Sequence, residues 1–125
     1  MNLVLDTNNY NNNNIFFYDP VKNTVMEDSK FIRIIYSDKH IILNGIYIKV
    51  NINQNNIINC IDNVENTILK KYNMNKIRLG KLKEQLEYLI KKYKNENIYI
   101  LKISGIWETN NMIGLTYKFI SINHL

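Results

Sequence analysis

The chain has 125 residues, 46% of them hydrophobic, and a formal net charge of +5, which is enough for one domain with a real core and excludes global disorder. It holds no uninterrupted apolar window of 18 residues, which excludes a transmembrane helix, and its start lacks the features of a signal peptide. Because the single cysteine, Cys60, cannot form an internal disulfide, composition favours a soluble, single-domain protein inside a cell.

Strand patterns occupy the first half of the chain. β-branched and aromatic residues predominate at 31–36 and 41–50, with a polar turn between them, which predicts a two-stranded hairpin. Since side chains alternate across a strand, Tyr47 and Lys49 are expected on the face opposite to the neighbouring isoleucines. An Asn-Gly pair at 44–45 interrupts the second strand and predicts a bulge or kink.

The middle of the chain has a helical period. Apolar residues recur every three or four positions over 57–72 and again over 82–93, which predicts two amphipathic helices. Cys60 lies beside the first apolar stripe and is expected to be a buried, inert thiol. Asp62 and Glu65 lie one helical turn apart, and we expect them on a solvated polar face rather than around a cation.

Strand patterns return at 98–104 and 112–122, and residues 107–111 between them have loop chemistry. The element order predicts an α+β fold: a curved antiparallel sheet, or a barrel like the oligonucleotide-binding (OB) fold, with two helices inserted between the third and fourth strands. Residues 1–14 are expected to form a weakly ordered, Asn-rich N-terminal segment. Residues 15–125 are expected to form a single α+β domain.

Basic residues are concentrated in the second half of the chain. Residues 1–62 carry a net charge of −1, from five basic and six acidic groups, whereas 63–125 carry +6, from eleven and five. Segment 70–94 alone carries +7, with nine basic groups against two acidic ones. Such a concentration attracts polyanions, and it also fits the solvated face of two helices in a lysine-rich chain.

Residues for metal or nucleophilic chemistry are scarce. His40, His124 and Cys60 are far apart in the sequence and show no metal-ligand spacing such as CxxC or HxxxH. The four glycines fit no phosphate-binding loop. We therefore expect no metal, no cofactor and no enzymatic activity.

Aromatic and basic residues are interleaved along the predicted strands. The rings are those of Tyr36, Tyr47, Tyr99, Trp107, Tyr117 and Phe119. Most of them are expected in the core, with Tyr47 and the loop residue Trp107 the least core-like. Surfaces of this composition bind single-stranded nucleic acid, because bases stack on the rings while lysines follow the phosphates. The candidate binding residues are Arg33, Tyr47, Lys49, Lys102, Trp107 and Lys118.

Two pairs of motifs resemble a poorly characterised family of small proteins in nucleocytoplasmic large DNA viruses (giant viruses). They are FIRIIYS at 31–37 with LNGIYI at 43–48, and LKISGIWET at 101–109 with IGLTYKF at 113–119. The resemblance spans residues 28–122. It implies a viral protein in the host cytoplasm, a viral factory or the virion.

The element order also resembles phage-type single-strand binding proteins, in which a helical insertion separates the third and fourth strands of an OB barrel. The chain departs from that pattern because it ends without an acidic tail and has two consecutive helices where one is usual. This resemblance is therefore one of fold.

The favoured hypothesis is a non-enzymatic viral protein that binds single-stranded DNA or RNA without strong sequence preference, with other viral proteins as further partners and no membrane association. The alternative is a virion structural or assembly protein that acts through protein–protein contacts. A basic groove would favour the first hypothesis, and an exposed apolar patch of several hundred Å² would favour the second.

Overall fold

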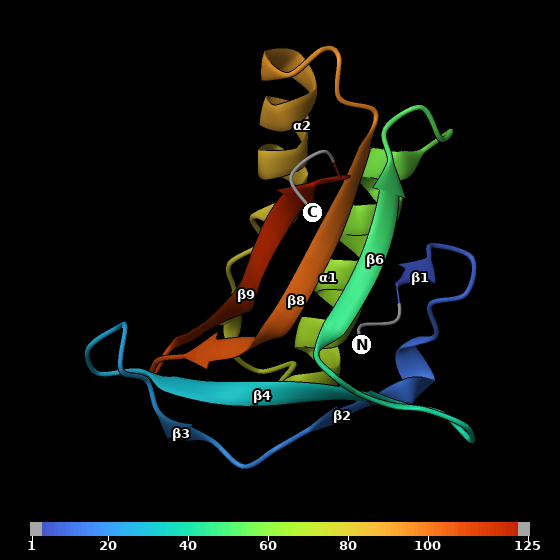
Figure 1. Cartoon of the computed structure of the whole chain (residues 1–125). Coiled ribbons are helices and arrows are strands. Elements are labelled where there is room, and N and C mark those ends of the chain that lie inside the picture. The colour runs from blue at the N-terminus through green and yellow to red at the C-terminus, as the bar shows by residue number, and fades with distance from the viewer. Residues whose placement is uncertain (1–3, 123–125) are drawn as a thin grey trace.

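Figure 1 shows a computed structural model of the chain, which describes residues 4–122. The fold is α+β, with an open, mixed sheet of nine strands and two α-helices in the described residues. The predicted α+β class is confirmed. The elements are β1 (Leu5–Asp6), the 3-10 turn η1 (Asn12–Asn14), β2 (Ile15–Phe17), β3 (Val21–Lys22), β4 (Lys30–Ser37), β5 (Ile42–Asn44), β6 (Ile46–Asn51), α1 (Ile57–Tyr72), β7 (Ile77–Arg78), α2 (Leu82–Lys92), β8 (Ile98–Glu108) and β9 (Met112–Ser121).

Strand β8 is the centre of the sheet. Strand β9 lies antiparallel along one edge of β8, while on the other edge β6 pairs with its first half and β4 with its second half. Beyond Arg33, β4 leaves β8 and pairs with β2 and β5 instead. The sheet bends where β6 gives way to β4, and β4 lies across the lower end of the long strands in Figure 1.

Gly45 forms the predicted interruption, between β5 and β6. Its φ of +87° lies in a region that other residues rarely adopt, and its N–H donates to the carbonyl of Ile34 at 2.9 Å. A β-carbon at this position would lie 3.1 Å from the carbonyl oxygen of Ile103. A β-bulge between Ile103 and Gly105 shifts the register of β8 against β9 nearby, and these two irregularities accompany the bend.

Two short strands make the sheet mixed rather than antiparallel. Strand β1 pairs parallel with β6, and β7 pairs parallel with β9. The predicted antiparallel arrangement is therefore correct for the long strands and wrong for these two pairs. In the described chain, six strands precede α1 and β7 separates the helices, so the insertion does not follow the third strand. Strands of two or three residues are too short to show a period in the sequence.

Residues 4–14 contact the rest of the fold. Leu5 and Asp6 are the register partners of Ile48 and Lys49 on β6. Farther along, the backbone N–H of Asn11 donates to the hydroxyl of Tyr36 at 3.0 Å. Residues of the segment 1–14 make these contacts. The weak order of that segment stays a prediction.

Helices α1 and α2, both predicted, cover one face of the sheet. Ile61 on α1 and Leu86 on α2 are fully buried, and they belong to one core cluster with the inward residues of β4, β6, β8 and β9. Within residues 4–122 the opposite face of the sheet bears no α-helix, and Figure 1 views the molecule from that side. Among the described residues, neither helix has the length and apolarity needed to cross a bilayer.

Two side chains of α1 differ from their predicted environments. Glu65 is only 1% exposed rather than solvated, because its carboxylate accepts hydrogen bonds from the backbone N–H groups of Lys81 and Leu82, both at 3.1 Å, at the start of α2. Cys60 is half-buried rather than fully buried, since it lies beside the apolar stripe and not on it.

Candidate nucleic-acid interface

The helix-free face of the sheet, here called the outer face, carries all six residues proposed from the sequence. On each long strand the residues that face the helices are buried and apolar, such as Ile48 on β6 and Leu101 on β8. Side chains alternate along a strand, so the residues between them point to the outer face. By this alternation and the strand register, the outer face carries Arg33 on β4, Tyr47 and Lys49 on β6, Lys102 and Trp107 on β8, and Lys118 on β9.

Tyr47, Lys102 and Lys118 form a row across three strands. Tyr47 is the register partner of Lys102, and Lys102 is the register partner of Lys118. The Lys102 Nζ lies 5.8 Å from the centroid of the Tyr47 ring, within cation–π range. Two like charges directly opposite one another are unfavourable in a sheet, and an anion between or above them would relieve that repulsion.

An open pocket of about 400 Å³ adjoins this row. Arg33 forms one side of it and is held by a hydrogen bond from its Nη1 to the Oδ1 of Asn44, at 3.3 Å. The lining residues are Phe31, Arg33, Asn44, Gly45, Tyr47, Lys102 and Ser104. Three of the six candidates therefore border one hollow, although Arg33 precedes Lys102 by more than half the chain.

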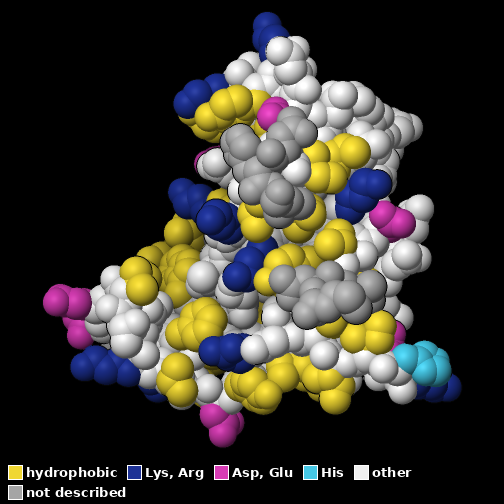
Figure 2. Space-filling model, in the orientation of Figure 1, with side chains coloured by type: hydrophobic (Ala, Val, Ile, Leu, Met, Phe, Trp, Pro, Cys, Tyr) yellow, Lys and Arg dark blue, Asp and Glu magenta, His cyan; other side chains and the backbone are white. Residues whose placement is uncertain are grey.

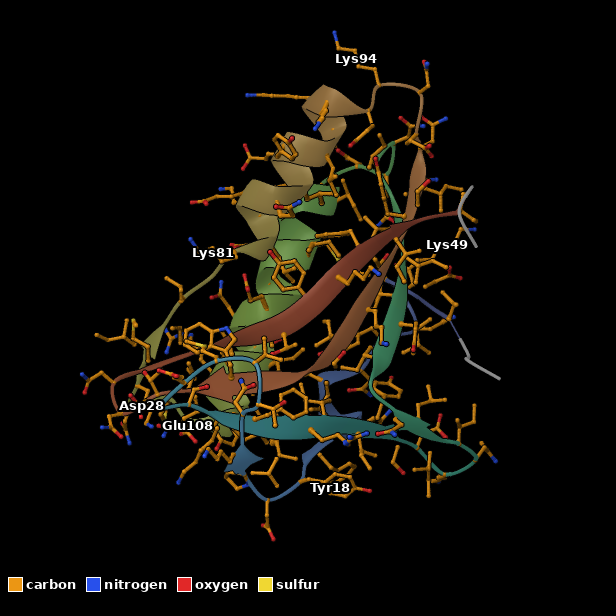
Figure 3. All side chains as sticks on the ribbon, turned by 60° about the vertical axis from the view of Figure 1, so that its left-hand side comes forward. Tyr18, Asp28, Lys49, Lys81, Lys94 and Glu108 are labelled. Carbon is orange, nitrogen blue, oxygen red and sulfur yellow. The ribbon has the colours of Figure 1, made fainter. Side chains whose placement is uncertain are left out.

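The other three candidates do not line this pocket. Lys49 lies two residues beyond Tyr47, opposite the apolar Ile100 of β8, and Figure 3 shows it on the upper part of β6. Lys118 lies across β8 from the pocket, and Trp107 lies past the bulge. All three lie on the outer face, each on a different side of the pocket.

Trp107 lies on β8 and not in the loop that the sequence predicted, because the turn begins only after Glu108. Its indole covers Gly114 of β9, where a β-carbon would lie 2.5 Å from the ring. In the same way the Phe31 ring covers Gly105, where a β-carbon would lie 2.7 Å from it. Rings that cover glycines protect exposed sheet backbone, so Trp107 has a structural role, and Phe31 is an outer-face ring that the sequence reasoning missed.

The remaining rings considered from the sequence belong to the core side. Tyr36 and Tyr99 are each only 3% exposed. Tyr117 and Phe119 are partly buried and pack against the core cluster. Of the six rings, only Tyr47 and Trp107 are therefore available on the outer face, as the alternation of β6 indicated for Tyr47.

The outer face is mainly basic. The outward positions of the described β4, β6, β8 and β9 hold four basic residues and no aspartate or glutamate, whereas the exposed Asp6 of the short strand β1 lies opposite Lys49 of β6. Figure 2 shows this side of the molecule, with Lys and Arg side chains spread among hydrophobic ones and Asp and Glu side chains mainly toward the margin. Surfaces on which one sign of charge predominates attract polyanions over several ångströms and lose this attraction in salt.

Most of the basic segment 70–94 lies away from this face, and Lys71, whose Nζ lies 5.7 Å from the centroid of the Phe16 ring, reaches its edge. The segment comprises the end of α1, β7, α2 and the residues after it, and the helices pack on the opposite side of the sheet. Lys81 and Lys94, which flank α2, lie well apart from Lys49 in Figure 3. The strand aromatics and most of the basic segment thus lie on separate surfaces.

A second polar cluster joins α1 to β8. The Tyr72 hydroxyl donates to Glu108 Oε1 at 2.9 Å, and Lys76 forms an ion pair with Glu108 Oε2 at 2.9 Å. Lys76 Nζ also donates to the carbonyl of Thr109 at 2.7 Å. Burial would raise the pKa of Glu108, but the hydrogen bonds from Lys76 and Tyr72 and the charge of Lys76 outweigh it and lower that pKa. Burial, then the bond to Glu108, raise the pKa of Tyr72 to about 12.

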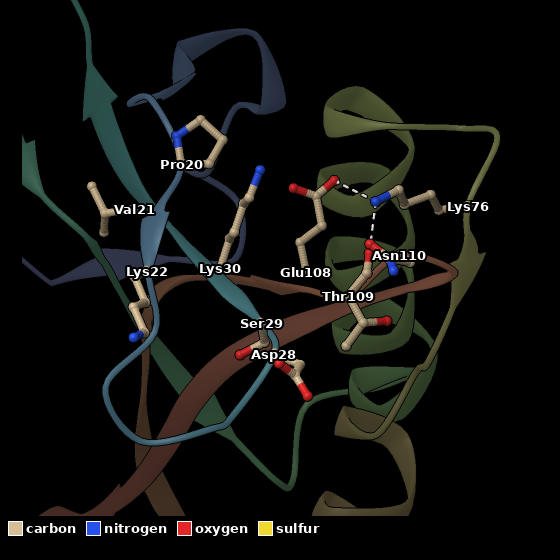
Figure 4. A pocket seen from close by; sticks show the side chains of 10 residues that line it. All are labelled: Pro20, Val21, Lys22, Asp28, Ser29, Lys30, Lys76, Glu108, Thr109 and Asn110. Carbon is tan, nitrogen blue, oxygen red and sulfur yellow. Dashed lines mark hydrogen bonds and ion pairs between the residues drawn. The ribbon is translucent and has the colours of Figure 1, made fainter.

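A pocket of about 330 Å³ opens beside this cluster, between β3, the start of β4 and the β8–β9 turn. Figure 4 shows Lys76 bonded to Glu108 on one side, with Lys30 extending along the other. A carboxylate that is ion-paired and has a lowered pKa is a poor general acid or base near neutral pH. We therefore assign the cluster a structural role. The described residues also contain no group of His, Cys, Asp or Glu that could hold a metal ion.

No protein-family model, no curated protein and no solved structure matches this chain.

Proposed function

We propose that this protein binds single-stranded DNA or RNA on its outer face, without strong sequence preference and without enzymatic activity. The observation that carries the proposal is the row Tyr47–Lys102–Lys118 beside the Arg33 pocket, on a face where the outward positions of the described β4, β6, β8 and β9 hold four basic residues and no acidic one. The row offers a ring and several cations to one ligand.

The ring and the cations contribute differently to binding. Each base that stacks on an aromatic side chain stabilises the complex by about 1–3 kcal/mol, whatever the base, because every base has a π-face. The cations release counterions from the phosphates and supply an affinity that falls with salt. A duplex covers its base faces by stacking, so the Tyr47 ring favours single strands over duplexes.

The proposal includes an OB-like use of the curved sheet, in which the strand face binds the oligonucleotide while the helices pack behind it. A viral setting, with the host cytoplasm, a viral factory or the virion as the place of action, is part of the same proposal. It is supported only by the motifs at 31–48 and 101–119.

The test is a titration of a labelled oligothymidine by fluorescence anisotropy at two salt concentrations. We expect binding that weakens with salt, a loss with Lys102→Ala, and a further loss of about 1–3 kcal/mol with Tyr47→Ala. The matched control is Lys91→Ala, which removes an equal charge from an exposed position on α2. Equal losses for Lys91→Ala and Lys102→Ala, with none for Tyr47→Ala, would mean nonspecific charge attraction and would contradict the proposal.

A further inference from the structure

A second hollow, here called the Phe16 groove, lies on the outer face beyond the pocket. It has a volume of about 440 Å³ and is lined mainly by Phe16 and Tyr18 from the β2 side, Ile35 from β4 and Ile42 from β5. Phe16 is the register partner of Ile35, and Ile35 points outward because Ile34 and Tyr36 beside it are buried. Phe16 and Tyr18 are each 54% exposed.

The groove adjoins the pocket along β4 and β5, since Arg33 and Asn44 line the pocket while Ile35 and Ile42 line the groove. Asn44 lines the pocket and is the register partner of Ile35, which lines the groove. The backbone N–H of Tyr18 donates to the carbonyl of Arg33 at 3.0 Å, so Tyr18 lies directly beside Arg33. The pocket and the groove thus lie next to each other on the outer face.

Cations flank the Phe16 groove on both sides. Arg33 lies on the side of the pocket, and the Lys71 Nζ lies 5.7 Å from the centroid of the Phe16 ring on the side of α1. Of the nearby acids, Asp38 accepts hydrogen bonds from the N–H groups of His40 and Ile41, and Asp19 follows Tyr18 in the exposed loop. Half-exposed rings between two cations suit a base between two phosphates.

We propose that the Phe16 groove holds further bases of the same single strand, so that the bound strand runs from the Tyr47–Lys102 row past Arg33 to Phe16 and Tyr18. This inference rests on the proposed function and specifies its extent. Lys49 and Tyr18 lie toward opposite ends of this face in Figure 3, so a short oligonucleotide would fill the pocket alone and a longer one would reach both hollows.

The experiment compares oligothymidines of about 4 and about 12 nucleotides, which lie within the range of site sizes of one OB fold. We expect Tyr18→Ala and Phe16→Ala each to weaken the longer oligonucleotide about tenfold and to leave the shorter one unchanged. Tyr18→Phe keeps the ring and should retain full affinity. Unchanged binding of the shorter oligonucleotide by Tyr18→Ala shows that its loss with the longer one does not come from misfolding.

The matched control is Tyr88→Ala. Tyr88 is 50% exposed on α2, with the Lys92 Nζ 5.3 Å from its ring centroid, so it offers the same ring and cation away from the outer face. If the longer oligonucleotide depends on Lys102 but not on Phe16 or Tyr18, this inference fails and the proposed function stands. If neither length binds, both fail. Self-association that Phe16→Ala abolishes, without any effect on oligonucleotide binding, would make the groove a protein contact and overturn the inference.

Discussion

The carboxylate of Glu65, in the middle of α1, accepts a hydrogen bond from the backbone N–H of Leu82, the first residue of α2, at 3.1 Å. A second bond of the same length reaches the N–H of Lys81. The first N–H groups of a helix have no partner within the helix, and Lys81 at the N-cap provides no side-chain bond. A residue of one helix thus supplies the cap of the other, and when this carboxyl group is ionised its charge lies at the positive end of α2.

Glu65→Ala should therefore destabilise the protein by about 2 kcal/mol, because it leaves two N–H groups at the start of α2 without their partner. Urea denaturation followed by circular dichroism measures the change. Asp62→Ala, one helical turn earlier, is the control and should change the free energy of unfolding by less than about 0.5 kcal/mol. Similar effects of both substitutions would show that the cap contributes little.

The same carboxylate should make stability depend on pH. Burial raises the pKa of Glu65 above its ordinary value of 4.5, although the two backbone hydrogen bonds oppose this. The folded state then holds the proton more tightly than the unfolded state, so this contribution is complete below about pH 4.5 and is lost as pH rises through the folded pKa. The stability difference between the wild type and Glu65→Gln should fall with rising pH over that window. A difference that rises there would contradict the assigned direction.

Glu108 should show the opposite dependence. Its pKa lies below 4.5, so its contribution is present above that pH and is lost as pH falls through the folded pKa. In a double-mutant cycle, Glu108→Gln and Lys76→Met should have a coupling energy of about 1 kcal/mol at neutral pH, smaller in acid. Lys22→Met, at the same pocket but with no bond to Glu108, serves as the control and should show no coupling.

Gly114→Ala should displace the Trp107 ring, since the added β-carbon would lie 2.5 Å from it. We expect a destabilisation of about 1–3 kcal/mol from overpacking and a change in fluorescence, for which Trp107 is the sole tryptophan. The same substitution in a Trp107→Leu background should destabilise the protein less. Equal costs in both backgrounds would place the strain in the backbone and not in the ring contact.

The salt dependence of binding should report how many cations of the outer face contact phosphates. Arg33, Lys49, Lys102 and Lys118 can meet about four phosphates, which gives a slope of log affinity against log salt of about −2.8, from about −0.7 for each contact on a single strand. Lys49→Ala or Lys102→Ala should weaken all sequences alike and flatten the slope by about 0.7. Trp107→Ala should leave the slope unchanged. A slope unaltered by either lysine substitution would place the phosphates on another surface, with segment 70–94 the first to test.

Local sequence patterns were sufficient to predict the two helices and to assign residues of the long strands to one face or the other. The stripe over 57–72 predicted α1, because a helix must turn one apolar side to the core. Alternation placed Tyr47 and Lys49 opposite the buried isoleucines, because successive side chains of a strand point to opposite faces. Trp107 was misplaced because Gly105 resembled the end of a strand, whereas a bulge carries β8 on to Glu108.

Tertiary structure alone decided which of these residues meet. Alternation assigns a side chain to a face but not to a neighbour, and the register that puts Tyr47, Lys102 and Lys118 in one row depends on pairing among three strands. The sequence therefore determined the composition of the outer face, and the strand register determined that a ring, several cations and a pocket adjoin on it. Glu65 shows the same division, since its helical position followed from the local period, but its role as a cap required α2 to begin beside it.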